Sequence, residues 1–154
     1  MGLSEAGERR LIGEVFRYWN ERRGRAGESE DTMLASLEDA PFWPQAFILE
    51  ILPEGTDFRV QHWGKGLGAL TEPLKPGQSM SERSSRLMDL VSGLGVAAVR
   101  ARKPVANSDR TVNRDGDEVL YRVIVAPIVG GDGQVLSVFG AANCRVLAAA
   151  GVRE

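Results

Sequence analysis

The first apolar pattern along the chain has the period of an amphipathic helix and covers residues 4–22. Its large apolar side chains return to one side of such a helix, which indicates a face that is buried against something else. They are Leu11, Ile12, Val15, Phe16 and Trp19. Ser4 can cap the first turn, and Gly24 follows the last one. The pattern therefore predicts a helix followed by an exposed connector.

A second long helix is predicted over residues 79–102, with a short helical piece expected earlier, around residues 32–39. Ser79 and Glu82 have the spacing of a capping box at its start. Gly93 and Gly95 lie in its interior, where each costs about 1 kcal/mol relative to alanine. We expect either a kink there or a neighbour that packs too closely to admit a side chain. The buried stripe is predicted to be Leu87, Met88, Val91, Leu94 and Ala98.

Five segments alternate or run apolar in the manner of β-strands. Two of them, residues 46–52 and 57–63, flank a turn sequence and predict a hairpin. Three more, residues 105–114, 118–128 and 134–145, are separated by Asp115-Gly116 and by residues 130–133, both of which are strong turn signals. The order is helix, two strands, a helical insert, and three strands. It predicts an α+β fold with a five-stranded antiparallel sheet.

Alternation along these strands divides the side chains between two faces of the sheet. Phe58, Val60 and His62 are expected to share the face that meets the long helix. A curved sheet over a helix can enclose a small-molecule pocket, or its side chains can fill that space completely; the sequence leaves both open. The residues predicted to line such a pocket are Phe47, Phe58, Val60, His62, Met88, Val91, Tyr121 and Val123.

The opposite face of the sheet is also predicted to be apolar, through Leu120, Ile124, Ala126 and Leu136. An exposed apolar surface of this kind is usually covered. The N-terminal helix carries a matching stripe, and it can cover its own sheet or that of a second copy. The residues expected at a dimer interface are Leu11, Val15, Phe16, Trp19 and Ile124.

Composition and charge narrow the function classes. The chain has 154 residues and a formal net charge of −2, which gives no basic surface field for nucleic acid or anionic lipid. The N-terminus lacks an apolar signal segment, and no apolar run approaches the roughly 20 residues that span a bilayer. We therefore expect a cytoplasmic protein without nucleic-acid or membrane partners. With one cysteine and one histidine, neither an internal disulfide nor a metal site is expected.

Three longer segments resemble the PAS family of bacterial sensory domains. They are "FRVQHWGKGLGALTEPLKPGQSM", "LYRVIVAPIVGGDGQVLSVFGAAN", and "VFRYWNERRGR" followed by "AFILEILPEGTDFRV". The third is similar to a stand-alone bacterial type in which an amphipathic helix precedes the sheet. The resemblance implies a PAS-like five-stranded antiparallel sheet with a helical insert between its second and third strands, and an N-terminal helix packed on the outer face.

The same resemblance implies a division of the chain and a function. Residues 1–26 would form the N-terminal helix and connector, residues 27–145 the PAS-like domain, and residues 146–154 a C-terminal tail long enough for a short helix. The function implied is a non-catalytic sensory domain that binds a small ligand or a protein partner and acts as a homodimer. The alternatives are a small α+β enzyme that uses His62 as general acid or base, and a purely structural dimerisation module with a filled core.

Two motifs point to cofactors but fit poorly. Gly64, Gly66 and Gly68 follow a strand, yet their spacing is not that of a dinucleotide fingerprint, and we read them as turn residues. Cys144 lies in "NCR", a tripeptide that light-sensing PAS relatives carry at their flavin site, but here it follows the last strand. Haem-binding relatives carry their histidine on the long helix, where this chain has none. Neither haem nor flavin is expected, and the ligand stays unknown.

Overall fold

A five-stranded antiparallel sheet forms the centre of the molecule, as the sequence predicts. The computed structural model describes residues 5–22, 34–53, 57–69, 74–82, 85–112, 115–130 and 132–148. The sheet has the strand order β2-β1-β5-β4-β3, so the first and last parts of the chain meet at its middle. Its strands are β1 (Ala46–Ile51), β2 (Phe58–Trp63), β3 (Val105–Val112), β4 (Glu118–Val129) and β5 (Val135–Ala148).

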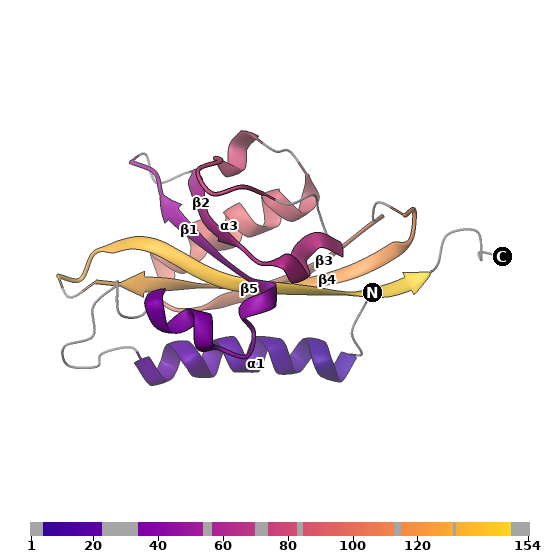
Figure 1. Cartoon of the computed structure of the whole chain (residues 1–154), viewed down its shortest axis with the longest axis horizontal. Helices are drawn as coiled ribbons and strands as arrows, with labels where there is room; N and C mark the ends of the chain where they lie inside the picture. The colour runs from indigo at the N-terminus through magenta and orange to yellow at the C-terminus, as the bar shows by residue number, and fades with distance from the viewer. Residues whose placement is uncertain are drawn as a thin grey trace.

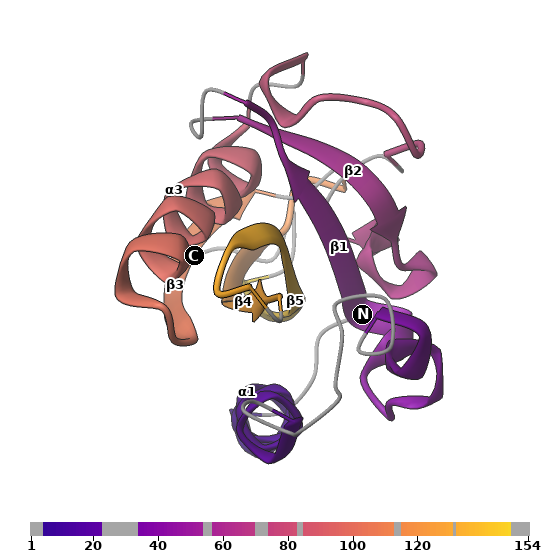
Figure 2. The ribbon, with the colours of Figure 1, turned by 90° about the vertical axis from the view of Figure 1, so that its left-hand side faces the viewer.

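The sheet is covered on both faces. Helix α3 (Arg86–Ala101) packs on the concave face and helix α1 (Glu5–Arg22) lies along the opposite, outer face, so three layers follow one another (Figures 1 and 2). Four short 3₁₀ helices also lie within the described residues: η1 (Leu37–Asp39), η2 (Trp43–Gln45), η3 (Lys65–Ala69) and η4 (Met80–Glu82). No helix within the described residues has the length and apolar content needed to cross a bilayer.

Helix α1 covers the sheet of its own chain. Leu11, Val15 and Trp19 are buried with Ile124 in one apolar cluster, and the indole Nε1 of Trp19 donates a hydrogen bond of 2.8 Å to the Pro127 carbonyl. Four of the five residues expected at a dimer interface are thus buried within one chain. Covering the outer face already satisfies the need to remove its apolar area from water.

The predicted stripe of α1 is wrong at one position. Phe16 is 50% exposed, and Tyr18 is buried instead. At 100° per residue, Phe16 lies about 140° around the helix from Leu11, whereas Tyr18 lies about 20° from it, so the geometry of a helix favours Tyr18. The Tyr18 ring meets the rings of Phe42 and Phe139 edge-on.

Helix α3 begins later than the sequence predicts. Its N-cap is Ser85, whose Oγ accepts a 3.1 Å hydrogen bond from the Met88 N–H. The predicted capping pair does interact, because the Ser79 N–H donates to the Glu82 carboxylate at 2.8 Å. That bond closes the separate 3₁₀ helix η4 rather than the first turn of α3. The capping-box pattern therefore correctly predicts a helical turn at Ser79, but that turn belongs to η4 and not to α3.

The last strand runs further than predicted. β5 ends at Ala148, so residues 146–148 belong to a strand and not to a terminal helix. The reason is the length of β4, whose first residues pair with this segment: Val119 with Val146 and Glu118 with Ala148. Residues 149–154 lie outside the described residues.

Two of the three glycines after β2, Gly64 and Gly66, allow a close approach between two segments of backbone. A Cβ on Gly64 would lie 2.3 Å from the Pro44 carbonyl oxygen, and one on Gly66 would lie 2.8 Å from it. The Gly64 N–H donates to the Ala46 carbonyl at 2.8 Å. Because β2 belongs to an antiparallel hairpin, this stretch lacks the βαβ setting in which such glycines hold a dinucleotide.

The two glycines of α3 give a matched pair of predictions. A Cβ on Gly95 would lie 2.6 Å from the buried ring of Phe58, whereas Gly93 is exposed with nothing within 4 Å of its Cβ position. We expect Gly95→Ala to lower the free energy of unfolding by about 1–3 kcal/mol through overpacking. Gly93→Ala should raise it by about 0.5–1 kcal/mol through helix propensity. Urea unfolding of both variants checks this, and equal effects would contradict the close contact with Phe58.

Candidate functional site

The concave face brings together seven of the eight residues predicted to line a pocket. None of them has more than 2% of its surface exposed. A cavity large enough for water would leave accessible surface on the side chains that line it, so these side chains contact protein atoms instead. They form one apolar core between the sheet and α3. The seven are Phe47, Phe58, Val60, Met88, Val91, Tyr121 and Val123.

His62 does not lie with them. The pairing of β1 with β2 shifts register, so that Leu49 pairs with Val60 but Ile48 pairs with His62. This irregularity at Gln61 breaks the simple alternation, because one extra residue in a strand sends the following side chains to the other face. The prediction that His62 shares a face with Phe58 is wrong. Trp63 joins the concave core in its place.

The imidazole of His62 lies flat on the indole of Trp43, with ring centroids 3.7 Å apart and planes inclined by 7°. Burial lowers the pKa of His62 from its usual value of 6.5. A backbone hydrogen bond with Trp43 and the nearby carboxylate of Glu38 act in the opposite direction, but more weakly. The ring is therefore held neutral as the pH falls to values at which an exposed histidine is already charged.

We expect His62 to titrate with a midpoint below 6.5. Since the unfolded chain then binds the proton more tightly than the folded one, stability should fall as the pH is lowered from about 6.5 through the folded pKa. The chain has one histidine, so its Cε1 proton resonance reports this pKa without ambiguity. Replacing Trp43 with leucine exposes the ring, and the midpoint should move back toward 6.5. A midpoint at or above 6.5 in the unmodified chain would contradict the buried stack.

One polar constellation borders the concave core. The hydroxyl of Tyr121 is buried near Arg86 and Asp109, but it makes no hydrogen bond of normal geometry with either. Arg86 and Asp109 form an exposed ion pair, with 3.0 Å between Nη2 and Oδ1. This hydrogen bond lowers the pKa of Asp109, and burial raises that of Tyr121. Sequence reasoning found Tyr121 but missed its neighbours, although Asp109 is its cross-strand partner.

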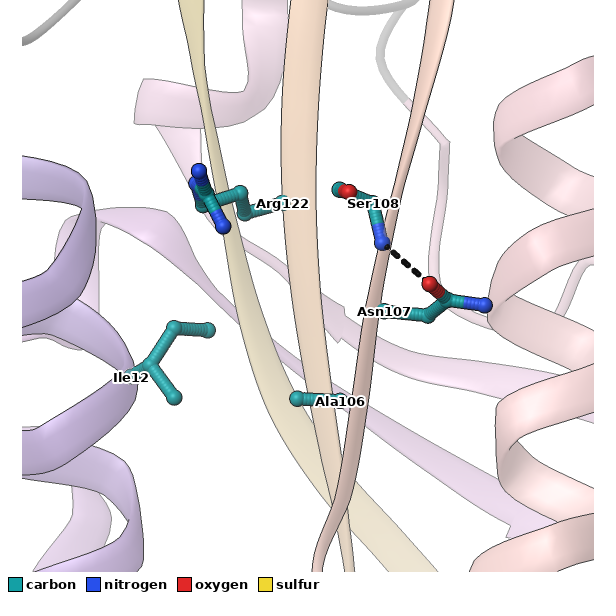
Figure 3. A pocket seen from close by; sticks show the side chains of 5 residues that line it. All are labelled: Ile12, Ala106, Asn107, Ser108 and Arg122. Atoms are coloured by element: carbon teal, nitrogen blue, oxygen red, sulfur yellow. Dashed lines mark hydrogen bonds between the residues drawn. The ribbon is translucent and has the colours of Figure 1, made fainter. Parts of the chain in front are cut away.

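The described residues border an open groove on the outer face of the sheet, beside α1. Its volume is about 320 Å³, and it is lined by Ile12 of α1, Ala106, Asn107 and Ser108 of β3, and Arg122 of β4. Figure 3 shows Ile12 facing Arg122 across the space between helix and sheet. We call this space the α1 groove. The sequence does not predict this groove, because its walls belong to elements that are far apart in the chain.

The composition of the described side chains limits the chemistry of either face. Among them, no group of three or more histidine, cysteine, aspartate or glutamate residues is arranged to hold a metal ion. Cys144 is buried on β5, opposite Tyr121. What the two faces offer is an apolar core with one buried hydroxyl, and a groove with a guanidinium on its wall. Both arrangements suit binding by contact and hydrogen bonding.

Comparisons with known proteins concern the fold. No family model and no curated protein matches the sequence. A PAS domain from Colwellia psychrerythraea superimposes with a TM-score of 0.48 and 18% identity, over 75% of this chain and 98% of that one. A light-oxygen-voltage (LOV) domain studied with a flavin analogue gives 0.50 and 14%, over 75% and 86%. A fungal LOV photoreceptor gives 0.49 and 16%, over 88% and 91%. The sheet and its helices are those of the PAS and LOV fold.

The second of these neighbours is described with a flavin analogue. A flavin does not fit the concave face of this chain. The seven predicted lining residues leave at most 2% of their surface accessible, so none of them offers an open face to a flavin ring. The chain's one cysteine lies on β5 and not on a helix ahead of α3. The chain's own core occupies the concave side.

Proposed function

We propose that this chain, which has the fold of PAS domains, is a non-catalytic sensory module that binds a small ligand or a protein partner and signals through dimerisation. The observation that carries the proposal is the layer of α1 on the outer face. Helix α1 is bound to the sheet through the hydrogen bond of Trp19 to Pro127. Near Ile12 the helix is separated from the sheet by the α1 groove. A helix held in this way can change its docking when something binds beside it.

The path from a bound molecule to α1 is short. Helix α1 contacts β4 and β5, and the same two strands carry the concave core on their other face. Val123 and Ile124 are neighbours in β4, one in the concave core and the other beneath α1. A shift of β4 caused by either face therefore reaches the helix directly.

A dimer interface, if it uses α1, must use the side of the helix that faces away from the sheet. Phe16 is the one residue of the expected interface that is exposed in a single chain. Aromatic side chains at the centre of an interface commonly carry much of its binding energy. The proposal therefore places Phe16 in the contact between two copies, with Leu11, Val15, Trp19 and Ile124 supporting it from beneath.

Two measurements on freshly purified protein test this function. Native mass spectrometry should find bound mass, and light scattering after size exclusion should find a dimer. Phe16→Asp should weaken that dimer at least tenfold while the fold is kept. Val112→Asp, which removes another exposed apolar side chain (59% exposed) on the edge strand β3, should leave it unchanged. A chain that stays monomeric and carries no bound mass would overturn the proposal.

A second candidate is a structural dimerisation module that takes no ligand. The filled concave core favours it, since Phe58 and Tyr121 have no accessible surface there. It predicts a dimer without bound mass. The enzyme alternative has less support: the Nε2 atom of His62 is buried without a hydrogen-bond partner, and its ring is stacked on Trp43 away from the concave core.

A further inference from the structure

We infer that the edge of the sheet along β3 is a pairing surface for a second copy of this chain, and that Asn107 and Asp109 keep this surface closed. Arg86 of α3 holds one of these two side chains in its closing position. The inference goes beyond the proposed function, because it concerns an edge of the sheet and not the faces that carry α1 and α3.

The two edges of the sheet differ in what covers them. β2 forms one edge, and residues 77–79 lie along it. The Val60 N–H donates to the Gln78 carbonyl at 2.8 Å, and the Gly77 N–H donates to the Val60 carbonyl at 2.8 Å. β3 forms the other edge, and among the described residues its only partner strand is β4. An edge without a partner is a template on which another chain can add a strand.

The N–H groups on the open side of β3 are bonded to side chains of the same strand. The Ser108 N–H donates to Oδ1 of Asn107 at 2.8 Å. The Arg110 N–H donates to Oδ1 of Asp109, also at 2.8 Å. Alternate residues of an edge strand bond to its neighbour, so Ser108 and Arg110 are residues whose N–H points away from β4. Pro104, which precedes the strand at an even-numbered position like these two, has no N–H to offer.

Helix α3 fixes the second of these closing side chains. Arg86 is the first residue of α3, and its Nη2 lies 3.0 Å from Oδ1 of Asp109. Its Nε donates to the other carboxylate oxygen at 3.3 Å. Two contacts from one guanidinium set the orientation of a carboxylate, here with Oδ1 against the Arg110 N–H. A change at the start of α3 would therefore release Asp109 and open this part of the edge.

A second copy fits the open edge in an antiparallel register about Ser108. In that register Ser108 lies opposite its own copy, and Ala106 lies opposite Arg110, so that the outward N–H and carbonyl groups of both strands meet. Asn107 lies opposite Asp109, and an amide can donate to a carboxylate. No like charges face each other. A register about Arg110 would instead set two guanidinium groups opposite each other, which is unfavourable.

Replacing both closing side chains tests the inference. The variant is Asn107→Val with Asp109→Val, made together with Phe16→Asp so that the proposed α1 contact does not contribute. Valine cannot accept the two N–H bonds and favours a strand, so this variant should self-associate at least tenfold more tightly than Phe16→Asp alone. Analytical ultracentrifugation over a range of concentrations measures this. Thr111→Val, the same kind of change on the same face of β3, should leave association unchanged.

Adding Ser108→Pro to the valine variant distinguishes edge pairing from general aggregation. The Ser108 N–H points away from β4, so proline removes a bond that two copies would share and none within the sheet. Association should then return to the level of Phe16→Asp alone. Association that persists with this proline would overturn the inference. A valine variant that associates no more tightly than the Thr111→Val control would overturn it as well.

Hydrogen exchange on Arg86→Gln decides the case if the valine variant fails to fold. The Arg86 side chain is 64% exposed, so this substitution should keep the fold. The Arg110 amide should exchange at least threefold faster, because Asp109 is no longer held against it. The Ser108 amide, which Asn107 closes, should exchange as before. An unchanged rate at Arg110 would contradict the role of Arg86 and overturn the inference.

Discussion

Gly140→Ala should lower the free energy of unfolding by about 3 kcal/mol or more, at the upper end of what overpacking a core costs. Gly140 lies in β5, the middle strand of the sheet, and pairs with Phe47 of β1 and Val125 of β4. A Cβ there would lie 2.1 Å from the Ile124 carbonyl oxygen and 2.7 Å from the Phe47 ring. The carbonyl belongs to a paired strand, so it cannot move without loss of ladder hydrogen bonds.

Gly13→Ala is the matched control for this substitution. Gly13 is exposed on α1, and nothing lies within 4 Å of the position that its Cβ would take. The same chemical change should there raise the free energy of unfolding by about 0.5–1 kcal/mol. Denaturant unfolding, followed by far-UV circular dichroism, measures both variants. If Gly140→Ala unfolds within about 1 kcal/mol of the unmodified chain, β4 and β5 have more room between them than the structure shows.

The element order and the faces of the longer strands could be predicted from the sequence because they depend on local periodicity. Alternation placed Tyr121 and Val123 on the face that meets α3, and Ile124 on the other. The helical stripe placed Leu11 and Val15 on the buried side of the N-terminal helix, and left open whether that side covers its own sheet or a second copy. In each element several apolar residues follow the same period, so one residue that departs from it does not change which face is predicted to be buried.

His62 shows where such reasoning fails. Its face depends on one irregularity in the pairing with β1, and nothing in β2 alone indicates an extra residue at Gln61. Register is a property of two strands, so the alternation within one strand cannot reveal a bulge. The consequence was large for the candidate site, because it moved the only imidazole away from the concave core and onto Trp43.

The α1 groove could not be predicted for a different reason. Its wall residues Ile12 and Arg122 are 110 positions apart by their numbers in the chain. Whether they touch or leave a groove depends on how far the helix stands off from the sheet at that point. That distance is set elsewhere, by bulky contacts such as the one between Tyr18 and Phe139. A groove of this kind is thus a result of packing, which periodicity does not encode.

Trp19→Ala should lower the free energy of unfolding by about 3–5 kcal/mol, the range found when a large buried aromatic side chain is truncated. Trp19 is 4% exposed, and its loss also leaves the Pro127 carbonyl without its 2.8 Å hydrogen bond. Phe16→Ala, on the same helix but half-exposed, should cost about 1 kcal/mol or less. Thermal and urea unfolding of the two variants measure this difference.

Hydrogen exchange on Trp19→Ala then tells whether α1 is part of the folding unit or a separable layer. If the helix releases before the sheet unfolds, its amides should exchange fast while those of β4 and β5 stay protected. Release uncovers Ile124, Phe139 and their neighbours, an apolar surface that a second copy could cover. The variant should therefore associate more strongly as its concentration rises. Uniform loss of protection across α1, β4 and β5 would instead show that helix and sheet fold as one body, and that signals cannot pass by undocking of α1.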